Sequence, residues 1–440
     1  MGYYRHLWRP QAHRTALNIC RKFGEEFRVA LTSGRVNLEV ARKLEANMDL
    51  KKWNLLPAIA AAAIILGPVT VNAQVLSVLH SFNGSDGQFA ESALVQGSDG
   101  NFYGTTALGG ANNKGTVFKI DSTGNLTTLH SFSGFPNDGA NPIAGLIQGS
   151  DGNFYGTTTL GGLFYQGTLF RITPAGAVTI LHSFSGLLGD GSVPMGGVVQ
   201  AADGNLYGTT ALGGAHSMGT VFRTALGIVV TLHSFSGAPG EGASPTAKLV
   251  RGSDGNFYGT TVRGGAQNLG TAFKISALGS FTMLHSFSGS PGEGANPVAG
   301  LVQGSDGNFY GTTGLGGEHY LGTAFKIDPA GNLTTLHSFS GSAGEGVDPL
   351  AGLVQASDGN FYGTTALGGA HYVGTLFKIT PAGSLTTLYS LSGSPAEGAS
   401  PFSALVQGSD GDFYGTTAAG GAHYRGTVFK FSLSAPAPAL

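Results

Sequence analysis

The pentapeptide Phe-Tyr-Gly-Thr-Thr recurs along the chain at an almost fixed spacing, and this period constrains the fold more than any other feature. The copies begin at Phe102, Phe154, Leu206, Phe257, Phe309, Phe361 and Phe413, the third with Leu in place of Phe. Successive copies start 51 or 52 residues apart. A period of this length, repeated seven times, indicates an array of similar supersecondary units.

Each unit is expected to contain four short antiparallel strands, which we name a, b, c and d. In one copy, strand a is an apolar run at 297–305, and a turn of Asp, Gly and Asn follows at 306–308. Residues 309–313, 323–327 and 332–339 are rich in β-branched and aromatic residues and predict strands b, c and d. Gly and Asn suit the turn because they tolerate positive φ. A four-stranded unit of about fifty residues matches a β-propeller blade.

The two ends of the array predict how the ring closes. Residues 75–82 read as a single d strand, whereas 403–431 supply strands a, b and c, after which the repeat stops. We therefore predict an all-β, seven-bladed β-propeller of four-stranded blades. Its ring would be closed by the N-terminal strand pairing with the C-terminal blade, which leaves no unpaired strand at the junction.

The region before the array has the layout of a secretory signal peptide. A short basic stretch at 48–54 precedes an apolar run at 55–69, and Val-Asn-Ala at 71–73 suits a cleavage site. We assign 48–73 to the signal peptide, 74–434 to the propeller and 435–440 to a short Pro/Ala tail. The apolar run is shorter than the roughly 20 residues of a membrane span, so an uncleaved anchor is the alternative. Residues 1–47 are interpreted as a non-native or disordered extension, with Met48 as the true start.

Charge separates the array from the preceding segment. Residues 1–52 hold 11 of the 23 Lys and Arg residues and 5 of the 25 acidic residues, so the remainder has a formal balance of −8. That sign disfavours nucleic-acid binding, which requires a basic surface. The only cysteine, Cys20, also precedes the array. We expect a secreted or periplasmic bacterial monomer with no membrane span in its mature form, no nucleic-acid partner and no cofactor.

The ordered elements of the repeat carry a family resemblance. Leu-His-Ser-Phe, Asp-Gly-Ala-x-Pro, Ser-Asp-Gly-Asn-Phe-Tyr-Gly-Thr-Thr and Gly-Thr-Val-Phe-Lys recur in order over about 75–432. This pattern resembles the GloVer-type tandem repeat of exported bacterial proteins, which implies an extracellular or surface location but no defined activity. It is more loosely similar to streptogramin lyase-type propellers. The catalytic His and Glu of that enzyme have no counterpart that can be placed here, so the resemblance implies no lyase activity.

Positions that recur in every blade are expected to be structural, because a binding or catalytic site is usually asymmetric. The Asp-Gly pairs are interpreted as a–b hairpin turns. Tyr103 and its equivalents are expected between blades, with the hydroxyl hydrogen-bonded. A histidine recurs in strand d, with Tyr389 replacing it once, and we expect a packed, hydrogen-bonded ring rather than a metal ligand. These histidines are His80, His130, His182, His233, His285 and His337.

A repeated acid in the d–a loop has two interpretations. The positions are Asp86, Asp138, Asp190, Glu241, Glu293, Glu345 and Glu397. Seven carboxylates on one face would form an acidic ring that attracts a cation at the mouth of the central channel. Alternatively, each acid caps a loop turn or is solvated. Free exchange of Asp and Glu favours the second interpretation over a precise metal site.

The b–c loop varies from blade to blade and supplies the candidate ligand-binding residues. Variable loops on a rigid scaffold commonly carry binding sites, and aromatic side chains there offer flat faces to sugars. The candidates are Phe164, Tyr165, His216, His319, Tyr320, His371, Tyr372, His423 and Tyr424. Arg251 is a further candidate, for an anion, because it replaces a glutamine that recurs in strand a of the other six blades. The alternative is that these side chains cover the neighbouring blade.

No nucleophile elbow, phosphate loop, zinc spacing or catalytic carboxylate pair stands out from the repeat. We therefore expect a non-catalytic exported propeller that recognises glycans or surface proteins through its b–c and d–a loops. One alternative is a lyase or glycoside-cleaving enzyme built from His319, His371, His423 and a nearby Glu. Another is a structural component of the envelope or matrix.

Overall fold

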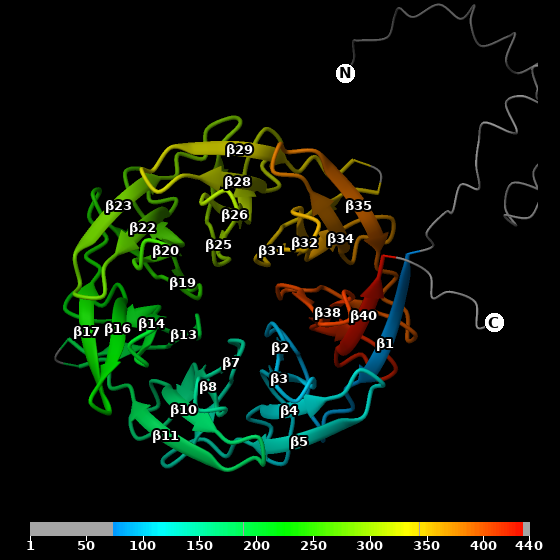
Figure 1. Cartoon of the computed structure of the whole chain (residues 1–440), viewed down its shortest axis with the longest axis horizontal. Coiled ribbons are helices and arrows are strands. Elements are labelled where there is room, and N and C mark those ends of the chain that lie inside the picture. The colour runs from blue at the N-terminus through cyan, green and yellow to red at the C-terminus, as the bar shows by residue number, and fades with distance from the viewer. Residues whose placement is uncertain (1–73, 188, 343, 434–440) are drawn as a thin grey trace, which may run out of the picture. The chain divides into compact units, whose positions relative to one another are not determined.

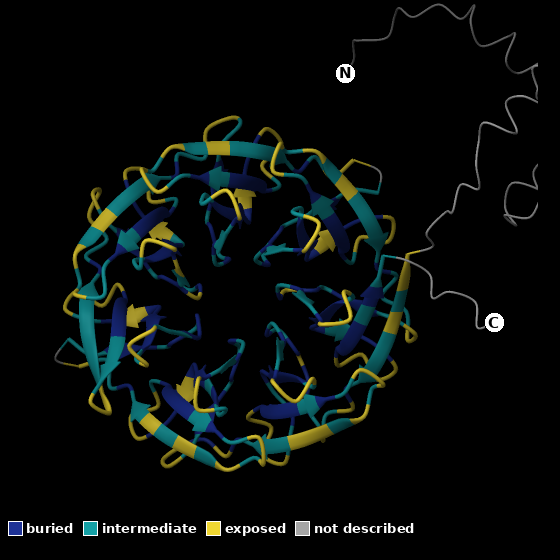
Figure 2. Cartoon of the chain, in the orientation of Figure 1, coloured by how far each residue is buried: buried dark blue, intermediate teal, exposed yellow. Residues whose placement is uncertain are grey.

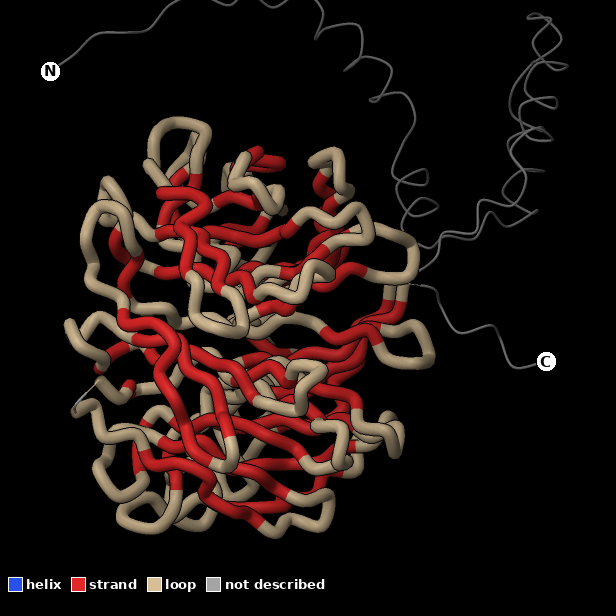
Figure 3. The backbone as a smooth tube through the Cα atoms, turned by 60° about the vertical axis from the view of Figure 1, so that its left-hand side comes forward, coloured by secondary structure: helices blue, strands red, loops and turns tan. Residues whose placement is uncertain are grey.

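The computed structural model describes residues 74–187, 189–342 and 344–433. These residues form strands and loops without any helix (Figure 3), so no helix that could cross a membrane occurs among them. Seven four-stranded antiparallel sheets are arranged around a central axis (Figure 1), as predicted. The N-terminal extension, the signal peptide and the C-terminal tail, which were assigned to 1–47, 48–73 and 435–440, lie outside the described residues.

The strands of each blade occur in the order a, b, c, d from the axis to the rim. The a strands are β2 (Val95–Gln96), β7 (Ile147–Gln148), β13 (Val198–Gln200), β19 (Val250–Arg251), β25 (Val302–Gln303), β31 (Val354–Gln355) and β37 (Val406–Gln407). The b strands are β3 (Phe102–Thr106), β8 (Phe154–Thr158), β14 (Leu206–Thr210), β20 (Phe257–Thr261), β26 (Phe309–Thr313), β32 (Phe361–Thr365) and β38 (Phe413–Thr417).

The two outer layers follow the same order. The c strands are β4 (Thr116–Ile120), β10 (Thr168–Ile172), β16 (Thr220–Ala225), β22 (Thr271–Ile275), β28 (Thr323–Ile327), β34 (Thr375–Ile379) and β40 (Thr427–Ser432). The d strands are β5 (Leu126–Ser131), β11 (Val178–Ser183), β17 (Ile228–Ser234), β23 (Phe281–Ser286), β29 (Leu333–Ser338), β35 (Leu385–Ser390) and β1 (Val75–Ser81). Blades 1 to 7 are numbered in the order of their b strands.

Small two-stranded ribbons join the d–a connection to the b–c connection of the next blade at six of the seven junctions, a feature that the repeat pattern does not predict, and a single bridge between Gln88 and Leu108 replaces the ribbon at the seventh. They pair β6 (Gly139–Ala140) with β9 (Leu160–Gly161), β12 (Gly191–Ser192) with β15 (Leu212–Gly213), β18 (Gly242–Ala243) with β21 (Arg263–Gly264), β24 (Gly294–Ala295) with β27 (Leu315–Gly316), β30 (Gly346–Val347) with β33 (Leu367–Gly368), and β36 (Gly398–Ala399) with β39 (Ala419–Gly420).

The predicted b and c strands are confirmed to the residue in blade 5, and the d strand nearly so. Strand a is much shorter than the apolar run at 297–305, because only Val302 and Gln303 pair with β26. Pro297 has no N–H to donate. Gly300 lies instead against the preceding blade, so close that a Cβ there would approach the Lys248 carbonyl oxygen to 3.0 Å.

The ring closes as predicted, through the N-terminal strand. β1 pairs antiparallel with β40, with Val75 opposite Ser432 and Ser81 opposite Thr427. β1 is thus the outermost strand of blade 7, beside β40 (Figure 1). The two ends of the array are joined by main-chain hydrogen bonds.

An aromatic stack joins neighbouring blades and explains why Phe and Tyr recur together. Tyr103 of blade 1 stacks on Phe154 of blade 2, with ring centroids 3.9 Å apart, and both rings are buried. The same contact recurs around the ring and closes between Tyr414 and Phe102 at 4.0 Å. Leu206 interrupts the series between blades 2 and 3. Figure 2 shows that strands b and c, between the a and d strands, are the most buried part of each blade.

The tyrosine hydroxyl is hydrogen-bonded, as predicted. Tyr103 donates to Asp99 Oδ2 at 2.8 Å, and Asp99 also accepts from the Asn101 backbone within the a–b turn. Burial, together with this bond to a carboxylate, raises the pKa of Tyr103. Each a–b turn is therefore anchored to the aromatic stack below it.

The recurrent strand-a glutamines bridge the blades instead of standing free in the channel. The Ser98 N–H donates to Gln148 Oε1 at 2.8 Å, and Gln148 Nε2 donates to Ser98 Oγ at 3.2 Å. Equivalent Gln–Ser contacts occur at six of the seven junctions. The seventh junction, between blades 3 and 4, has Ala202 and Arg251 instead.

Replacing Phe82 with Ala tests ring closure. Phe82 follows β1 and is fully buried against Phe118 of blade 1, so we expect its loss to lower the free energy of unfolding by about 3–5 kcal/mol. Phe287, its equivalent in blade 4, is equally buried. Urea unfolding should therefore give similar losses for Phe82→Ala and Phe287→Ala. A negligible loss for Phe82→Ala alone would show that β1 does not close the ring.

Candidate functional site

The propeller has two chemically different ends. The a–b and c–d turns lie at one end, which we call the turn face. The b–c and d–a connections lie at the other, because the ribbons hydrogen-bond them to each other, as between Ala140 and Leu160. We call this second end the connection face.

Exposed apolar side chains are concentrated on the connection face. Twenty large apolar side chains are exposed among the described residues, and fifteen of them belong to b–c or d–a connections. The c–d turns expose only Leu226 and Leu278. Apolar surface gathered on one side of a protein marks an interaction site more often than scattered exposure does.

One position of the b–c connection adopts the left-handed conformation in all seven blades. The residues are Asn113, Tyr165, Ser217, Asn268, Tyr320, Tyr372 and Tyr424, with φ between 53° and 61°. Asn suits this conformation, whereas a bulky side chain there costs about 1 kcal/mol. The loop geometry is therefore set by the repeat, and the side chain placed on it differs by blade.

The asparagines and the tyrosines use this position differently. Asn113 Oδ1 accepts from the Gly109 N–H at 3.0 Å, and Asn268 Oδ1 accepts from Gly264 at 2.9 Å, so each closes its own loop. The side chains of Tyr320, Tyr372 and Tyr424 are 64%, 79% and 66% exposed. Among the described residues these three hydroxyls make no hydrogen bond and these rings make no stacking contact.

The structure brings nine of the ten predicted ligand-binding residues to the connection face. Phe164 and Tyr165 are exposed there, and Tyr165 stacks on Phe135 with ring centroids 4.2 Å apart. His216 is near enough to Glu241 to help lower the pKa of that carboxyl. Arg251 is the exception, because it ends β19 beside the a–b turn.

The histidines that the enzyme alternative would use lie in the b–c connections of three successive blades. His319, His371 and His423 are exposed, each on its own blade. Glu397 is close enough to His371 for this histidine to help lower its pKa, but it is already bonded to Tyr389, whose hydroxyl donates to Glu397 Oε1 at 2.5 Å. Within the described ranges, no group of three His, Cys, Asp or Glu side chains is placed to hold a metal ion.

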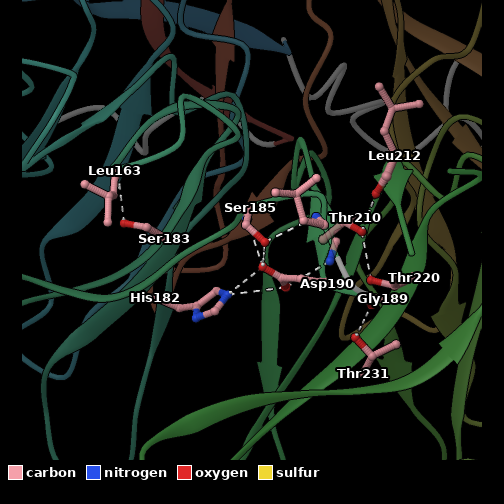
Figure 4. A network of polar contacts seen from close by, with 12 residues as sticks. Leu163, His182, Ser183, Ser185, Gly189, Asp190, Thr210, Leu212, Thr220 and Thr231 are labelled. Carbon is pink, nitrogen blue, oxygen red and sulfur yellow. Dashed lines mark hydrogen bonds and ion pairs between the residues drawn. The ribbon is translucent and has the colours of Figure 1, made fainter. Parts of the chain in front are cut away.

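The first interpretation of the d–a acids, an acidic ring at the channel mouth, is wrong, because these acids lie beside the outermost strands. His80, His130, His182, His285 and His337 contact the acid of their own loop at 2.5–3.3 Å. Asp190 also accepts from Ser185 N at 2.8 Å and from Gly191 N at 2.9 Å (Figure 4). The alternative interpretation, that these acids cap loop turns, is confirmed, and strand-d histidines serve as their partners.

In six of the d–a loops, contacts of this kind lower the pKa of the carboxyl. Burial alone would raise the pKa of Asp138, but hydrogen bonds from His130 and from the Ser133 and Gly139 N–H groups outweigh it and lower the pKa. The a–b turn acids behave alike. The pKa of Asp254 is lowered, because hydrogen bonds from Asn256 and Tyr258 outweigh the effect of burial.

Sequence reasoning missed a set of exposed leucines that begins four of the seven b–c connections. Leu160, Leu212, Leu315 and Leu367 are 44–50% exposed beside the aromatic loops. Leu108, Arg263 and Ala419 occupy the equivalent positions in the other blades. The repeated Leu-Gly-Gly sequence could have revealed these leucines. Its glycines indicate a loop, and its leucine places an apolar side chain on the connection face.

We expect acid to destabilise the propeller. A carboxyl whose pKa is lower in the folded than in the unfolded state stabilises the fold above its unfolded pKa, near 4, and this contribution is lost as pH falls through the folded value. The d–a and a–b acids whose pKa values are lowered should all contribute to this loss of stability in acid. Urea midpoints should therefore fall between about pH 5 and about pH 2. Constant midpoints over this range would contradict the proposed role of these acids.

Solved structures confirm the architecture but share little sequence with the chain. The extracellular domain of a protein described as a hybrid two-component system of Bacteroides thetaiotaomicron superposes with a TM-score of 0.53 at 14% identity, over 80% of this chain and 40% of that one. A second such domain from the same organism gives 0.52 at 11%, over 81% and 39%. The chain thus spans about 40% of the length of these proteins. The periplasmic gluconolactonase of Pseudomonas aeruginosa gives 0.42 at 16%, over 68% and 84%.

A search of curated proteins found no match. The model of the Gloeobacter/Verrucomicrobia repeat, in contrast, matches residues 67–201, 175–347 and 342–437, which together cover all seven blades. This is the family that the recurring Phe-Tyr-Gly-Thr-Thr elements of the sequence resemble. The chain therefore belongs to the Gloeobacter/Verrucomicrobia repeat family.

Proposed function

We propose that this protein is an exported recognition module that binds glycans through its connection face. The observation that carries the proposal is the set of exposed tyrosines at a left-handed loop position. Tyr320, Tyr372 and Tyr424 occupy this position on three successive blades, where Asn113 and Asn268 show the residue that the loop itself favours.

The conformational cost of placing a tyrosine at the left-handed loop position supports a role for these tyrosines beyond the folding of the loop. Backbone strain in a folded protein gathers where it serves a function. Asparagine would relieve the strain and supply a loop-closing hydrogen bond, as Asn268 does in blade 4. An exposed tyrosine in its place provides neither benefit to the fold. Its ring is instead presented to solvent, where a ligand would meet it.

The chemistry of the face favours saccharides. A tyrosine ring offers a flat apolar surface with a polar tip, which suits stacking on a sugar ring and hydrogen bonding to its hydroxyls. Each of these tyrosines has an exposed histidine beside it, as in His371–Tyr372, and imidazole adds a second donor or acceptor. The face thus combines separated aromatic surfaces with polar groups.

Two further features agree with a role in recognition outside the cytoplasm. The segment at 48–73 has the layout of an export signal. Propellers of similar architecture occur as extracellular domains of proteins described as two-component systems. A protein ligand is the alternative for the same face, because its exposed leucines would suit an apolar partner.

The triple variant Tyr320→Asn, Tyr372→Asn and Tyr424→Asn tests the proposal on residues 74–440. We expect the parent to bind members of a broad glycan array and the variant to bind them at least about tenfold more weakly, because the stacking surfaces are lost. The variant should be no less stable than the parent, and it should gain up to about 1 kcal/mol per site from relief of strain. Isothermal titration calorimetry and urea unfolding measure the two effects.

Leu226→Asn is the matched control. Leu226 is also exposed and also left-handed, with φ of 51°, but it lies in a c–d turn on the opposite face. Its replacement should leave glycan binding unchanged. A folded parent that binds no glycan, or a triple variant that binds as well as the parent, would overturn the proposal.

A further inference from the structure

The Lys and Arg side chains of the propeller are distributed unevenly among the blades, and this asymmetry bears on which ligands the connection face can bind. Among the described residues, seven of the twelve Lys and Arg side chains occupy the same position of strand c, one per blade. They are Lys119, Arg171, Arg223, Lys274, Lys326, Lys378 and Lys430. Of the other five, Lys114 and Arg425 lie in b–c connections, and the remaining three belong to blade 4.

Each of the three blade-4 cations replaces a residue of another kind that recurs in the other blades. Lys248 stands where Ala93, Gly145, Gly197, Gly300, Gly352 and Ala404 stand elsewhere. Arg251 replaces glutamine, and Arg263 replaces leucine or alanine. One blade therefore departs from the repeat three times, each time toward positive charge.

Lys248 belongs to the ring of residues nearest the axis, which we call the axial ring. Its small members touch across blades: a Cβ on Gly145 would lie 2.8 Å from the Ala93 carbonyl oxygen, and one on Gly197 would lie 3.1 Å from that of Gly145. The Lys248 side chain is exposed to solvent. Partial desolvation by neighbouring protein atoms lowers the pKa of its ammonium.

The three cations are spread over blade 4 from the connection face to the turn face. Arg263, in β21, lies on the connection face, Lys248 lies at the axial ring, and Arg251, in β19, lies at the turn face. Lys248 and Arg251 are three residues apart, roughly 10 Å along an extended chain. All three side chains are exposed, and none makes a hydrogen bond or an ion pair within residues 74–187, 189–342 and 344–433.

Glu91 supplies the opposite charge on another blade. It precedes the axial ring in blade 1, at a position that is Ile143, Met195, Thr246, Val298, Leu350 or Phe402 elsewhere. Burial raises its pKa. Glu91 on blade 1 and Lys248 on blade 4 therefore place opposite charges at or next to the axial ring.

We propose that the axis of the connection face binds an anionic saccharide, with its carboxylate groups directed to Lys248 and Arg263 of blade 4. This inference rests on the proposed function, because the tyrosine loops would hold the same chain. Uronic acid units fit the asymmetry: their carboxylates pair with the unpaired cations of blade 4, and their hydroxyls donate to Glu91. Arg251 extends the cationic edge to the turn face.

The test uses polygalacturonate oligomers and the same oligomers with their carboxylates methyl-esterified, which keeps the backbone and removes the charge. We expect residues 74–440 to bind the charged form at least about tenfold more tightly at low salt, since hydrogen bonds between charged groups are stronger than neutral ones. The difference should shrink as salt is raised. Calorimetry at two salt concentrations measures both.

The deciding variant restores the repeat with Lys248→Gly, Arg251→Gln and Arg263→Leu. These are residues that other blades carry at the same positions, so the fold should persist. We expect this variant to bind the two oligomers within about twofold of each other. The control Lys119→Gln, Lys326→Gln and Lys378→Gln removes equal charge from strand c of other blades and should keep the preference.

Several results would overturn the inference. They are equal binding of both oligomers by the parent, a preference that survives in the blade-4 variant, failure of a folded parent to bind either oligomer, or tighter binding of poly-glutamate than of polygalacturonate. The tyrosine variant separates the two proposals. If neutral glycans bind through the tyrosines but carboxylates add nothing, the axial inference fails and the proposed function stands.

Discussion

The inter-blade stack of tyrosine on phenylalanine is the interaction on which the rest of the structure depends. Tyr258 of blade 4 stacks on Phe309 of blade 5 at 3.9 Å, and its hydroxyl is fixed by Asp254 of its own a–b turn. The Phe-Tyr-Gly-Thr-Thr motif thus forms strand b of its blade. Its Phe and Tyr rings contribute to the interfaces with the two neighbouring blades, and its tyrosine hydroxyl anchors the a–b turn. Each aromatic pair contributes about 0.5–1.5 kcal/mol beyond its buried area, and repetition around a closed ring leaves no blade without a partner.

A scaffold held in this way allows its loops to vary. The left-handed position of the b–c connection has the same φ in every blade whether Asn, Ser or Tyr occupies it. The stack and the ribbons therefore determine the backbone, and the side chain can be chosen for another purpose. Tyr372, the most exposed of the four tyrosines at this position, shows the result: an unfavourable residue is tolerated because the surrounding blade is fixed.

Much of the architecture could be predicted from the sequence, because repetition exposes it. The b strand at Phe309–Thr313 and the closing strand at Val75–Ser81 follow from alternation, turn residues and counting. The short a strand could not be predicted, since the residues at 298–301 are apolar but pack around the axis instead of pairing. The acidic ring was misplaced for a related reason: one-dimensional spacing does not reveal that His130 draws Asp138 to the rim.

The candidate site was only partly predictable. Exposed aromatic loops were visible as variation between blades, but the strain that makes Tyr320 informative depends on φ. Lys248 and Glu91 were overlooked although their signal was in the sequence. Both interrupt a column of small or apolar residues, and only their position at the axis gives that interruption a meaning. In a repeat protein, such departures from the repeat are the places to look for function.

The central claim is that ligands bind at the connection face, where the chain departs from its own repeat. A crystal structure of residues 74–440 with a bound oligosaccharide would test it most directly. The account predicts sugar density against Tyr320, Tyr372 or Tyr424 and toward blade 4 at the axis. Density confined to the turn face or the outer rim, with the tyrosines still facing solvent, would contradict it.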